Sequence, residues 1–276
     1  MTHGYDLDAA SPSAAANQAR YASLSETVSA LPGAALDVAY GDHPRQRLDV
    51  FPAGTGAPVV IFFHGGYWRA GTKDARRFMV PHWRERGVSW VGVNYRLTPD
   101  AALSDCVDDA RDAVAWLHAR AAVYGLDPDG FHVTGNSAGA HLAAMVAAGD
   151  TDRPVPLRSL CVVSGLFDLA PLAGTKADDW LRLDARTIAD LSPLAHLPPA
   201  TLPVVASCGG AESEAFKEQT RRYAQACRAN GNDVTEADSP GNDHFMVIGD
   251  YADPKTDLFR KLHARVAGRS APRDQM

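Results

Sequence analysis

The stretch that decides the fold is Gly135-Asn136-Ser137-Ala138-Gly139, which follows the apolar run Phe131-His132-Val133-Thr134 and precedes a helix-like segment, His141 to Ala148. A serine between two glycines at a strand-to-helix junction is typical of a sharp turn that exposes the serine hydroxyl. Side chains at the glycine positions would crowd that hydroxyl. Gly, Ser and Ala are common residues, so the pentapeptide alone also fits an ordinary glycine-containing turn. The rest of the sequence has to decide between the two interpretations.

A second glycine pair lies upstream, directly after another apolar run. Pro58 to Phe63 is typical of a buried strand, and it is followed by His64-Gly65-Gly66-Tyr67-Trp68. A serine that attacks a carbonyl group needs N–H donors directed at the oxygen on which negative charge develops. We expect these donors to be the amide of Gly65 or Gly66 and the amide of Ala138, which follows the serine. The side chain of His64 is interpreted as a brace for this loop rather than a catalyst.

A carboxylate and a histidine follow along the chain, in the order serine, acid, histidine. Leu202 to Cys208 reads as a late strand, and Gly209-Gly210-Ala211-Glu212-Ser213-Glu214 follows it. An acid just beyond the carboxyl end of this strand is predicted to be Glu212, with Glu214 as the near competitor. His244 lies on a Pro/Gly/Asn-rich loop near the end of the chain and is the predicted general base.

These residues together predict nucleophilic catalysis. His244 would accept the proton of Ser137 during attack on a carbonyl carbon, and Glu212 would orient the imidazole and stabilise its cation. Neither a metal nor a cofactor is required for this chemistry.

Composition and charge limit the class of protein. The chain has 276 residues and a net charge of −6, which gives no reason to expect nucleic acid or an anionic membrane as partner. The short basic pair Arg76-Arg77 is interpreted as part of a solvated helix face. The four cysteines have no metal-ligand spacing and are expected to be reduced. With no secretory or membrane-spanning pattern, the expected location is cytoplasmic. The expected partner is a small amide or ester substrate, with a homodimer left open.

Strands alternate with helices along the chain, which predicts an α/β fold with a mostly parallel central sheet covered by helices on both faces. Residues 1–30 are expected to be an N-terminal arm, partly helical, and residues 31–268 a single domain. The Pro-rich segment 164–201 interrupts the alternation and is interpreted as a small cap or lid. Residues 269–276 are expected to be a disordered tail.

Several short motifs occur in one order from about residue 38 onward. They are His64 to Arg69 (HGGYWR), Tyr95 to Pro99 (YRLTP), Gly135 to His141 (GNSAGAH), Ser164 to Leu169 (SGLFDL), Glu212 to Phe216 (ESEAF) and Asp243 to Phe245 (DHF). This combination resembles the kynurenine formamidase (arylformamidase) branch of the α/β-hydrolases, which is close to the hormone-sensitive-lipase-like esterases. The resemblance implies the α/β-hydrolase fold, with Ser137 as nucleophile, His244 as base and Glu212 at the acid position.

The sequence departs from that family pattern at two positions. The acid of the formamidases is usually Asp, and Glu212 is one methylene longer, which leaves Glu214 open as an alternative. Ala140 stands where the pattern usually has another glycine, so it adds a methyl group near the serine.

The resemblance implies hydrolysis of N-formyl-L-kynurenine, or of a related small N-acyl amide, to formate or another acid and an aromatic amine. Four aromatic residues are expected to line an apolar site for the aryl group: Tyr67, Trp68, Phe167 and Trp180. A short-chain carboxylesterase is the alternative within the same chemistry. A non-catalytic binding protein on the same scaffold is the alternative from another class.

Overall fold

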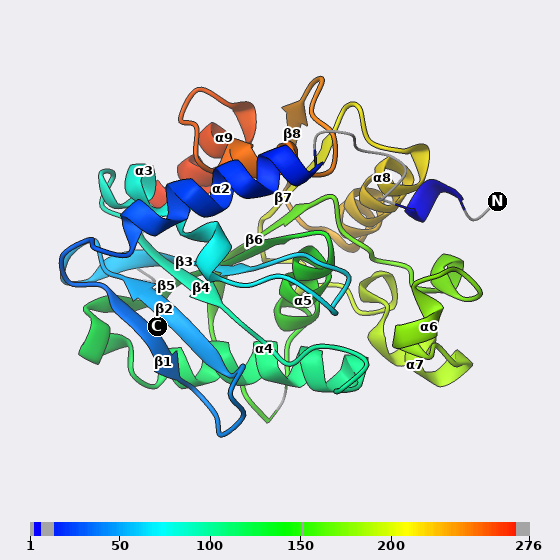
Figure 1. Cartoon of the computed structure of the whole chain (residues 1–276), viewed down its shortest axis with the longest axis horizontal. Coiled ribbons are helices and arrows are strands. Elements are labelled where there is room, and N and C mark those ends of the chain that lie inside the picture. Colours follow the sequence, from blue (N-terminus) through cyan, green and yellow to red (C-terminus); the bar gives the residue numbers. More distant parts are fainter. Residues whose placement is uncertain (1–2, 7–13, 151, 269–276) are drawn as a thin grey trace.

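An eight-stranded sheet runs through the middle of the molecule, with helices on either side (Figure 1). The structure is a computed structural model that describes residues 3–6, 14–150 and 152–268; the predicted tail and part of the predicted arm lie outside these ranges. The strand order is β1-β2-β4-β3-β5-β6-β7-β8. The strands are β1 (Ala35–Ala39), β2 (Arg47–Phe51), β3 (Ala57–Phe63), β4 (Ser89–Val93), β5 (Leu126–Asn136), β6 (Leu157–Val163), β7 (Val204–Gly209) and β8 (Val234–Ser239).

Most of this sheet is parallel. β2 pairs antiparallel with β1 and with β4, and all pairs from β4 to β8 are parallel. The carboxyl ends of the parallel strands therefore meet at one edge, where ligand sites of open α/β sheets form. The predicted fold class, a mostly parallel sheet covered on both faces, is confirmed.

Two apolar cores lie on opposite faces of the sheet. Alternate residues of β3 point to opposite sides: Val59, Ile61 and Phe63 belong to one core, and Val60 and Phe62 to the other. The first core is closed by α4 (Leu103–His118), α5 (Ala138–Ala147) and α8 (Glu214–Asn230). The second is closed by α3 (Val80–Arg84) and α9 (Asp257–Ala267).

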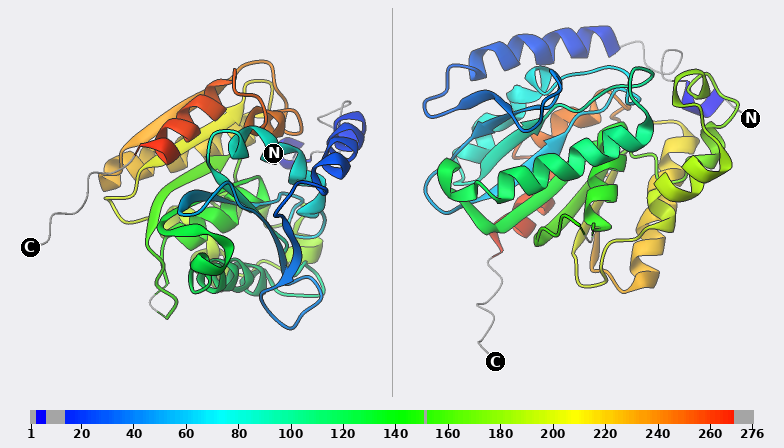
Figure 2. Two further views of the ribbon diagram at one scale, coloured as in Figure 1. Left: turned by 90° about the vertical axis from the view of Figure 1, so that its left-hand side faces the viewer. Right: turned by 90° about the horizontal axis from the view of Figure 1, so that it is seen from below.

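Helix α2 (Ala14–Val28) lies outermost on the side of α3, over the 3₁₀ helix η2 (Asp74–Met79) (Figure 1, Figure 2). The ring of Tyr21 stacks on Phe78 with centroids 4.3 Å apart, and the hydroxyl of Ser25 accepts the Phe78 N–H at 3.1 Å. Another short 3₁₀ helix, η1 (His3–Tyr5), lies against α8, because the Ser213 hydroxyl donates to the Gly4 carbonyl at 2.6 Å. Residues of the N-terminal region thus reach the carboxyl edge of the sheet.

The segment between β6 and β7, residues 164–201, carries only short helices. They are η4 (Ala170–Leu172), α6 (Asp178–Leu181), α7 (Ala185–Leu191) and η5 (Pro193–Ala195), and they project beside α8 (Figure 1). We call this stretch the cap segment. The remaining 3₁₀ helices are η3 (Ala121–Tyr124) and η6 (Val247–Tyr251). The cap segment is tied to the first core by His141 on α5, whose Nε2 lies 2.7 Å from the Leu191 carbonyl oxygen.

Candidate functional site

Ser137 lies at the junction of β5 and α5 in a backbone conformation that residues other than glycine rarely adopt, with φ 55° and ψ −124°. The two glycines of the pentapeptide are needed because backbones approach each other closely here. A Cβ at Gly139 would lie 2.0 Å from the Phe63 carbonyl oxygen, and a Cβ at Gly135 would lie 2.3 Å from the Gly139 carbonyl oxygen. The glycines therefore let strand, turn and helix pack against the end of β3, and the strained turn holds Ser137 at the carboxyl edge.

The loop after β3 passes directly beside the serine. A Cβ at Gly65 would lie 3.0 Å from the Cβ of Ser137, so only glycine fits there. The next three residues, Gly66, Tyr67 and Trp68, have φ values of 126°, 51° and 56°. Such a run in the left-handed region is uncommon and clusters at functional sites.

The predicted donors to a developing oxyanion divide into two groups. The Gly65 amide donates to the Asn136 side-chain oxygen at 3.2 Å, so in this structure it already has an acceptor. The Gly66 amide makes no hydrogen bond to a described residue. Ala138 is the first residue of α5, where an N–H has no partner within the helix and the helix dipole favours negative charge. Gly66 and Ala138 are thus the candidate donors.

Glu212 and His244 are in contact. The Nδ1 of His244 lies 2.6 Å from Oε2 of Glu212, and both side chains are buried. The other carboxylate oxygen, Oε1, accepts hydrogen bonds from the Ser164 hydroxyl and from the Gly209 amide, the latter at 2.7 Å. Burial alone would raise the pKa of Glu212, but the charge of His244 and these hydrogen bonds hold that pKa below its ordinary value. The carboxylate is therefore ionised and fixed in orientation.

Glu214 is excluded from this arrangement. It is the first residue of α8, its side chain is 89 % exposed, and it pairs with Lys217 at 3.0 Å. Of the two acids that the sequence left open, only Glu212 reaches the histidine.

The loops that carry Glu212 and His244 are joined by backbone hydrogen bonds. The Gly210 amide donates to the Ser239 carbonyl at 2.9 Å, and the Ala211 amide donates to the Asn242 carbonyl at 3.0 Å. Asn242 is held in turn, since its side-chain amide donates to Asp250 at 3.0 Å. These hydrogen bonds between the loops that follow β7 and β8 bring the acid and the base together.

Ser137 and His244 face a common cavity of about 1050 Å³ at the carboxyl edge. The Nε2 of His244 is buried and has no hydrogen-bond partner among the described residues, so no bond joins it to the Ser137 hydroxyl in this structure. Catalytic hydrogen bonds are often long in ligand-free sites and shorten in the substrate complex. Gly65, Gly66, Tyr67 and Trp180 line the same cavity.

Two of the four predicted substrate-binding aromatic residues do not line this cavity. Trp68 is fully buried, and its ring packs edge-on against His141 at 4.9 Å. Phe167 is also fully buried and stacks on Tyr223 with centroids 4.2 Å apart. Both expectations are corrected: these rings belong to the core, where elements distant in sequence cover them.

The other two aromatic residues lie at the cavity and touch each other. The indole Nε1 of Trp180, on α6, donates to the Tyr67 carbonyl at 3.1 Å, and the two rings lie 6.1 Å apart. The Tyr67 hydroxyl donates to the Tyr5 carbonyl at 2.5 Å. The cap segment and the N-terminal η1 thus both hold the loop that carries Gly66.

Some residues of the site were missed by sequence reasoning. Ser164 and Gly209 hold the Glu212 carboxylate, and a Cβ at Gly209 would lie 2.9 Å from its Oε1. Ser164 is the first residue of the SGLFDL motif, and its place in that motif was the sequence signal that could have identified it. Residues of η1 and α2 also line the cavity, and nothing in their composition points to this: Tyr5, Asp6, Ala15, Gln18, Ala19 and Ala22.

His64 and His141 are buried beside the site without facing the cavity. The Nδ1 of His64 lies 2.9 Å from the Gly65 carbonyl oxygen, and its ring stacks on Tyr95 at 4.5 Å. Burial lowers the pKa of His64 to about 3 and that of His141 to about 4, so both rings are neutral at pH 7. They brace the loop after β3 and helix α5.

Two features are absent from the part of the chain that the structure describes. No three His, Cys, Asp or Glu side chains there come together as metal ligands would. None of its helices combines the length and apolar character needed to cross a bilayer.

Comparison with known proteins agrees with this fold. The BD-FAE family model matches residues 49–160. The chain is 29% identical to a kynurenine formamidase of Danio rerio, covering 85% of this chain and 82% of the relative. It is 30% identical to a kynurenine formamidase of Salmo salar, covering 78% of each. A solved structure from Silicibacter sp. TM1040, provisionally named a thioesterase, superposes with a TM-score of 0.82 at 28% identity, covering 94% of this chain and 97% of the other. The chain is therefore a hydrolase that belongs to the kynurenine formamidase family of α/β-hydrolases.

Proposed function

We propose that this hydrolase cleaves an aryl formamide, such as N-formylkynurenine, with Ser137, His244 and Glu212 as its catalytic triad. The observation that carries the proposal is the buried Glu212–His244 pair, 2.6 Å apart, on the same cavity as the strained Ser137. The names of the relatives from Danio rerio and Salmo salar support the choice of substrate.

The first half of the reaction forms an acyl-enzyme. The Nε2 of His244 accepts the proton of Ser137 as the serine oxygen attacks the formyl carbon. Glu212 holds the imidazole in the tautomer that can accept this proton and stabilises the cation that results. The oxygen of the tetrahedral intermediate accepts hydrogen bonds from the amides of Gly66 and Ala138.

The second half releases both products. His244 gives its proton to the nitrogen of the leaving aryl amine, a step that amides need because an amine anion is a very poor leaving group. A water molecule, deprotonated by His244, then attacks the formyl ester of Ser137 and releases formate. Ser137 regains its proton from His244, and the site returns to its initial state.

The cavity also has the walls that an aryl leaving group needs. Tyr67 and Trp180 supply aromatic faces, and Phe245 and Ile248 extend the apolar lining. These residues come from the loop after β3, the cap segment and the region that follows β8.

The first experiment tests for a reactive serine. Treatment with a fluorophosphonate should add the phosphonyl group to Ser137, measured as a mass increase of the intact protein and located by peptide mapping. Ser137→Ala is the control and should remain unmodified. Absence of an adduct on folded wild-type protein would favour a non-catalytic binding protein on this scaffold.

The second experiment compares substrate classes. The kcat/KM values for N-formylkynurenine and formanilide should be measured beside those for p-nitrophenyl acetate and p-nitrophenyl butyrate. We expect the aryl formamides to be turned over at rates that depend on Ser137. Inert formamides with rapid ester hydrolysis would instead assign the short-chain carboxylesterase activity.

A further inference from the structure

Arg76, on η2, lines the candidate catalytic cavity and has almost no partners. The only hydrogen bond that its side chain makes among the described residues runs from Nη1 to the carbonyl oxygen of the adjacent Ala75, at 3.3 Å. Its Nε is buried without any partner. The interpretation of Arg76-Arg77 as part of a solvated helix face is therefore wrong for Arg76, which points into a cavity instead of solvent.

The neighbouring cations on the same stretch show how buried charge is normally compensated in this chain. Lys73 is fully buried and lies 2.6 Å from Asp37 and 2.9 Å from Asp49. Arg77 pairs with the other oxygen of Asp49 at 2.7 Å and also with Asp74. Burial would lower the pKa of Arg77, but these carboxylates raise it, whereas burial lowers the pKa of Arg76. The Nε of Arg76 is buried, and its guanidinium has no carboxylate partner among the described residues, which is costly unless a ligand supplies one.

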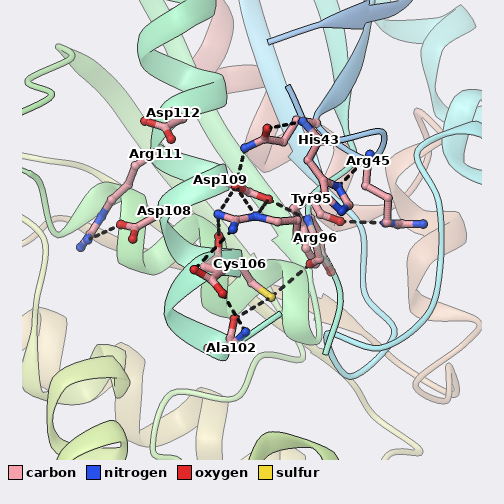
Figure 3. A network of polar contacts seen from close by, with 12 residues as sticks. His43, Arg45, Tyr95, Arg96, Ala102, Cys106, Asp108, Asp109, Arg111 and Asp112 are labelled. Carbon is pink, nitrogen blue, oxygen red and sulfur yellow. Dashed lines mark hydrogen bonds and ion pairs between the residues drawn. The ribbon is translucent and has the colours of Figure 1, made fainter. Parts of the chain in front are cut away.

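Arg96 shows the geometry that a satisfied guanidinium adopts in this protein (Figure 3). Its Nε lies 3.0 Å from both carboxylate oxygens of Asp109, and its Nη2 lies 2.7 Å from Oδ1. Two parallel N–H bonds of this kind are strong and set the orientation of the carboxylate. On Arg76, neither Nε nor Nη2 has a hydrogen-bond partner among the described residues.

The cavity as a whole carries more positive than negative charge. Its lining includes the cationic side chains of Arg69, Arg76 and Lys176, against one carboxylate, that of Asp6. The Arg69 guanidinium lies over the Trp180 ring at 4.3 Å, and Arg69 is exposed, so it has a cation–π partner and contact with water. Arg76 has neither an aromatic ring nor a carboxylate as partner among the described residues, and its Nε is buried.

We infer that Arg76 is a specificity-determining residue that binds a carboxylate group of the substrate at a distance from the bond being cleaved. This inference rests on the proposed hydrolase function of the same cavity and deepens it: it names the residue that binds the carboxylate of the acyl amide substrate. The carboxylate would occupy the place that Asp109 occupies for Arg96. Its pairing with Arg76 would anchor the substrate, so that the scissile carbonyl lies at Ser137.

The test compares substrates that differ only in this charge. N-formylkynurenine and its carboxamide should be assayed with wild type, Arg76→Gln, Arg76→Lys and Arg69→Gln. We expect wild type to favour the acid in kcat/KM by about ten- to hundredfold, mainly through KM. Arg76→Gln should reduce this ratio to near one and Arg76→Lys should restore part of it. Arg69→Gln removes the same charge from an exposed position of the same cavity and should keep most of the preference.

A second measurement keeps the inference separate from the proposed function. Inhibition of p-nitrophenyl acetate hydrolysis by kynurenine and by kynurenine carboxamide reports on carboxylate binding even if no formamide is cleaved. Wild type should bind the acid more tightly than the carboxamide. Arg76→Gln should bind the two with equal affinity. Equal binding of acid and amide to wild type, or an unchanged preference in Arg76→Gln, would overturn the inference.

Thermal unfolding distinguishes ligand binding from a structural role. Since Arg76 has no ion-pair partner within the described part of the chain, Arg76→Gln should leave the Tm unchanged or raise it by a few degrees. A Tm lowered by several degrees would assign Arg76 to the fold and overturn the inference.

Discussion

At the scale of the residue, the carboxylate of Glu212 is held by three donors and cannot turn away from His244. Ser164, the Gly209 amide and the His244 ring each use one of its lone-pair directions. The extra methylene of Glu, compared with Asp, is accommodated because Gly209 leaves room beside Oε1. Glu in place of Asp therefore fits at this position because residue 209 is glycine.

Replacement of Glu212 should remove most of the catalytic rate. We expect Glu212→Gln to lower kcat by about 10³- to 10⁴-fold, because the histidine loses the charge that fixes its tautomer and stabilises its cation. Glu214→Gln is the matched control and should change kcat less than twofold, since Glu214 is exposed on α8. The measurement is kcat of each variant with the same substrate, the one that wild type hydrolyses best. Similar losses in both variants would contradict the assignment of the acid.

At the scale of the element, the site depends on how closely α5 packs against the end of β3. All ten residues of α5 are buried, and six of them are alanine or glycine. Small side chains let the helix axis approach the sheet, and Gly139 is the point of closest approach. The position of Ser137 is set by this packing and by the turn that precedes it.

Gly139→Ala should destabilise the protein despite the better helix propensity of alanine. Propensity alone would stabilise the helix by about 1 kcal/mol. The new Cβ, however, would lie 2.0 Å from the Phe63 carbonyl oxygen, so β3 and α5 must separate, at a net cost of about 3 kcal/mol. Urea unfolding measures the change. Gly174→Ala is the control: its Cβ meets open space, so only the strain of φ +74° should appear. A more stable Gly139→Ala protein would show that this close approach is relaxed in solution.

The cap segment should influence the rate through one hydrogen bond. Trp180→Phe keeps an aromatic ring at the cavity but loses the bond from Nε1 to the Tyr67 carbonyl, so the loop that carries Gly66 is held less firmly. We expect kcat/KM to fall about three- to tenfold, the equivalent of one hydrogen bond. Trp116→Phe, the same substitution on α4, serves as control and should leave the kinetics unchanged. Equal kinetics for Trp180→Phe and wild type would mean that the cap segment does not support this loop.

At the scale of the whole molecule, the buried histidines couple stability to pH. His64, His132 and His141 lie in the interior, and burial lowers the pKa of the first to about 3 and of the other two to about 4. Unfolding returns each ring to water, where its pKa is about 6.5. Below pH 6.5 the unfolded chain therefore binds protons that the folded protein does not bind, and stability falls as the pH falls.

The free energy of unfolding should therefore decline between pH 6.5 and pH 4. Each of these histidines contributes a slope of up to about 1.4 kcal/mol per pH unit in that range. Urea unfolding at pH 7, 6 and 5 measures the decline. His132→Gln should flatten the curve, whereas the exposed His43→Gln should not. A profile that is level down to pH 5 would mean that these rings protonate within the folded protein.

The elements that the sequence predicts best are those with strong local signals. Local patterns predict strands at residues 47–51 and 157–163 and helices at about 73–86 and 214–230. β2, β6 and α8 begin and end at these residues, and α8 ends where Gly231 adopts the left-handed conformation that terminates helices. The predicted helix from Lys73 to Arg86 is instead a 3₁₀ helix followed by α3.

The sequence by itself determined the order of strands and helices, the sharp turn at Ser137 and the succession of serine, acid and histidine along the chain. These features depend on residues that are neighbours in sequence: apolar runs, glycines at a turn and loop residues after a strand. Only the tertiary structure decided that Glu212 rather than Glu214 meets His244, that Trp68 and Phe167 are covered, and that Arg76 borders the cavity without a carboxylate. Burial and pairing depend on elements that are far apart in sequence, so no local pattern contains them.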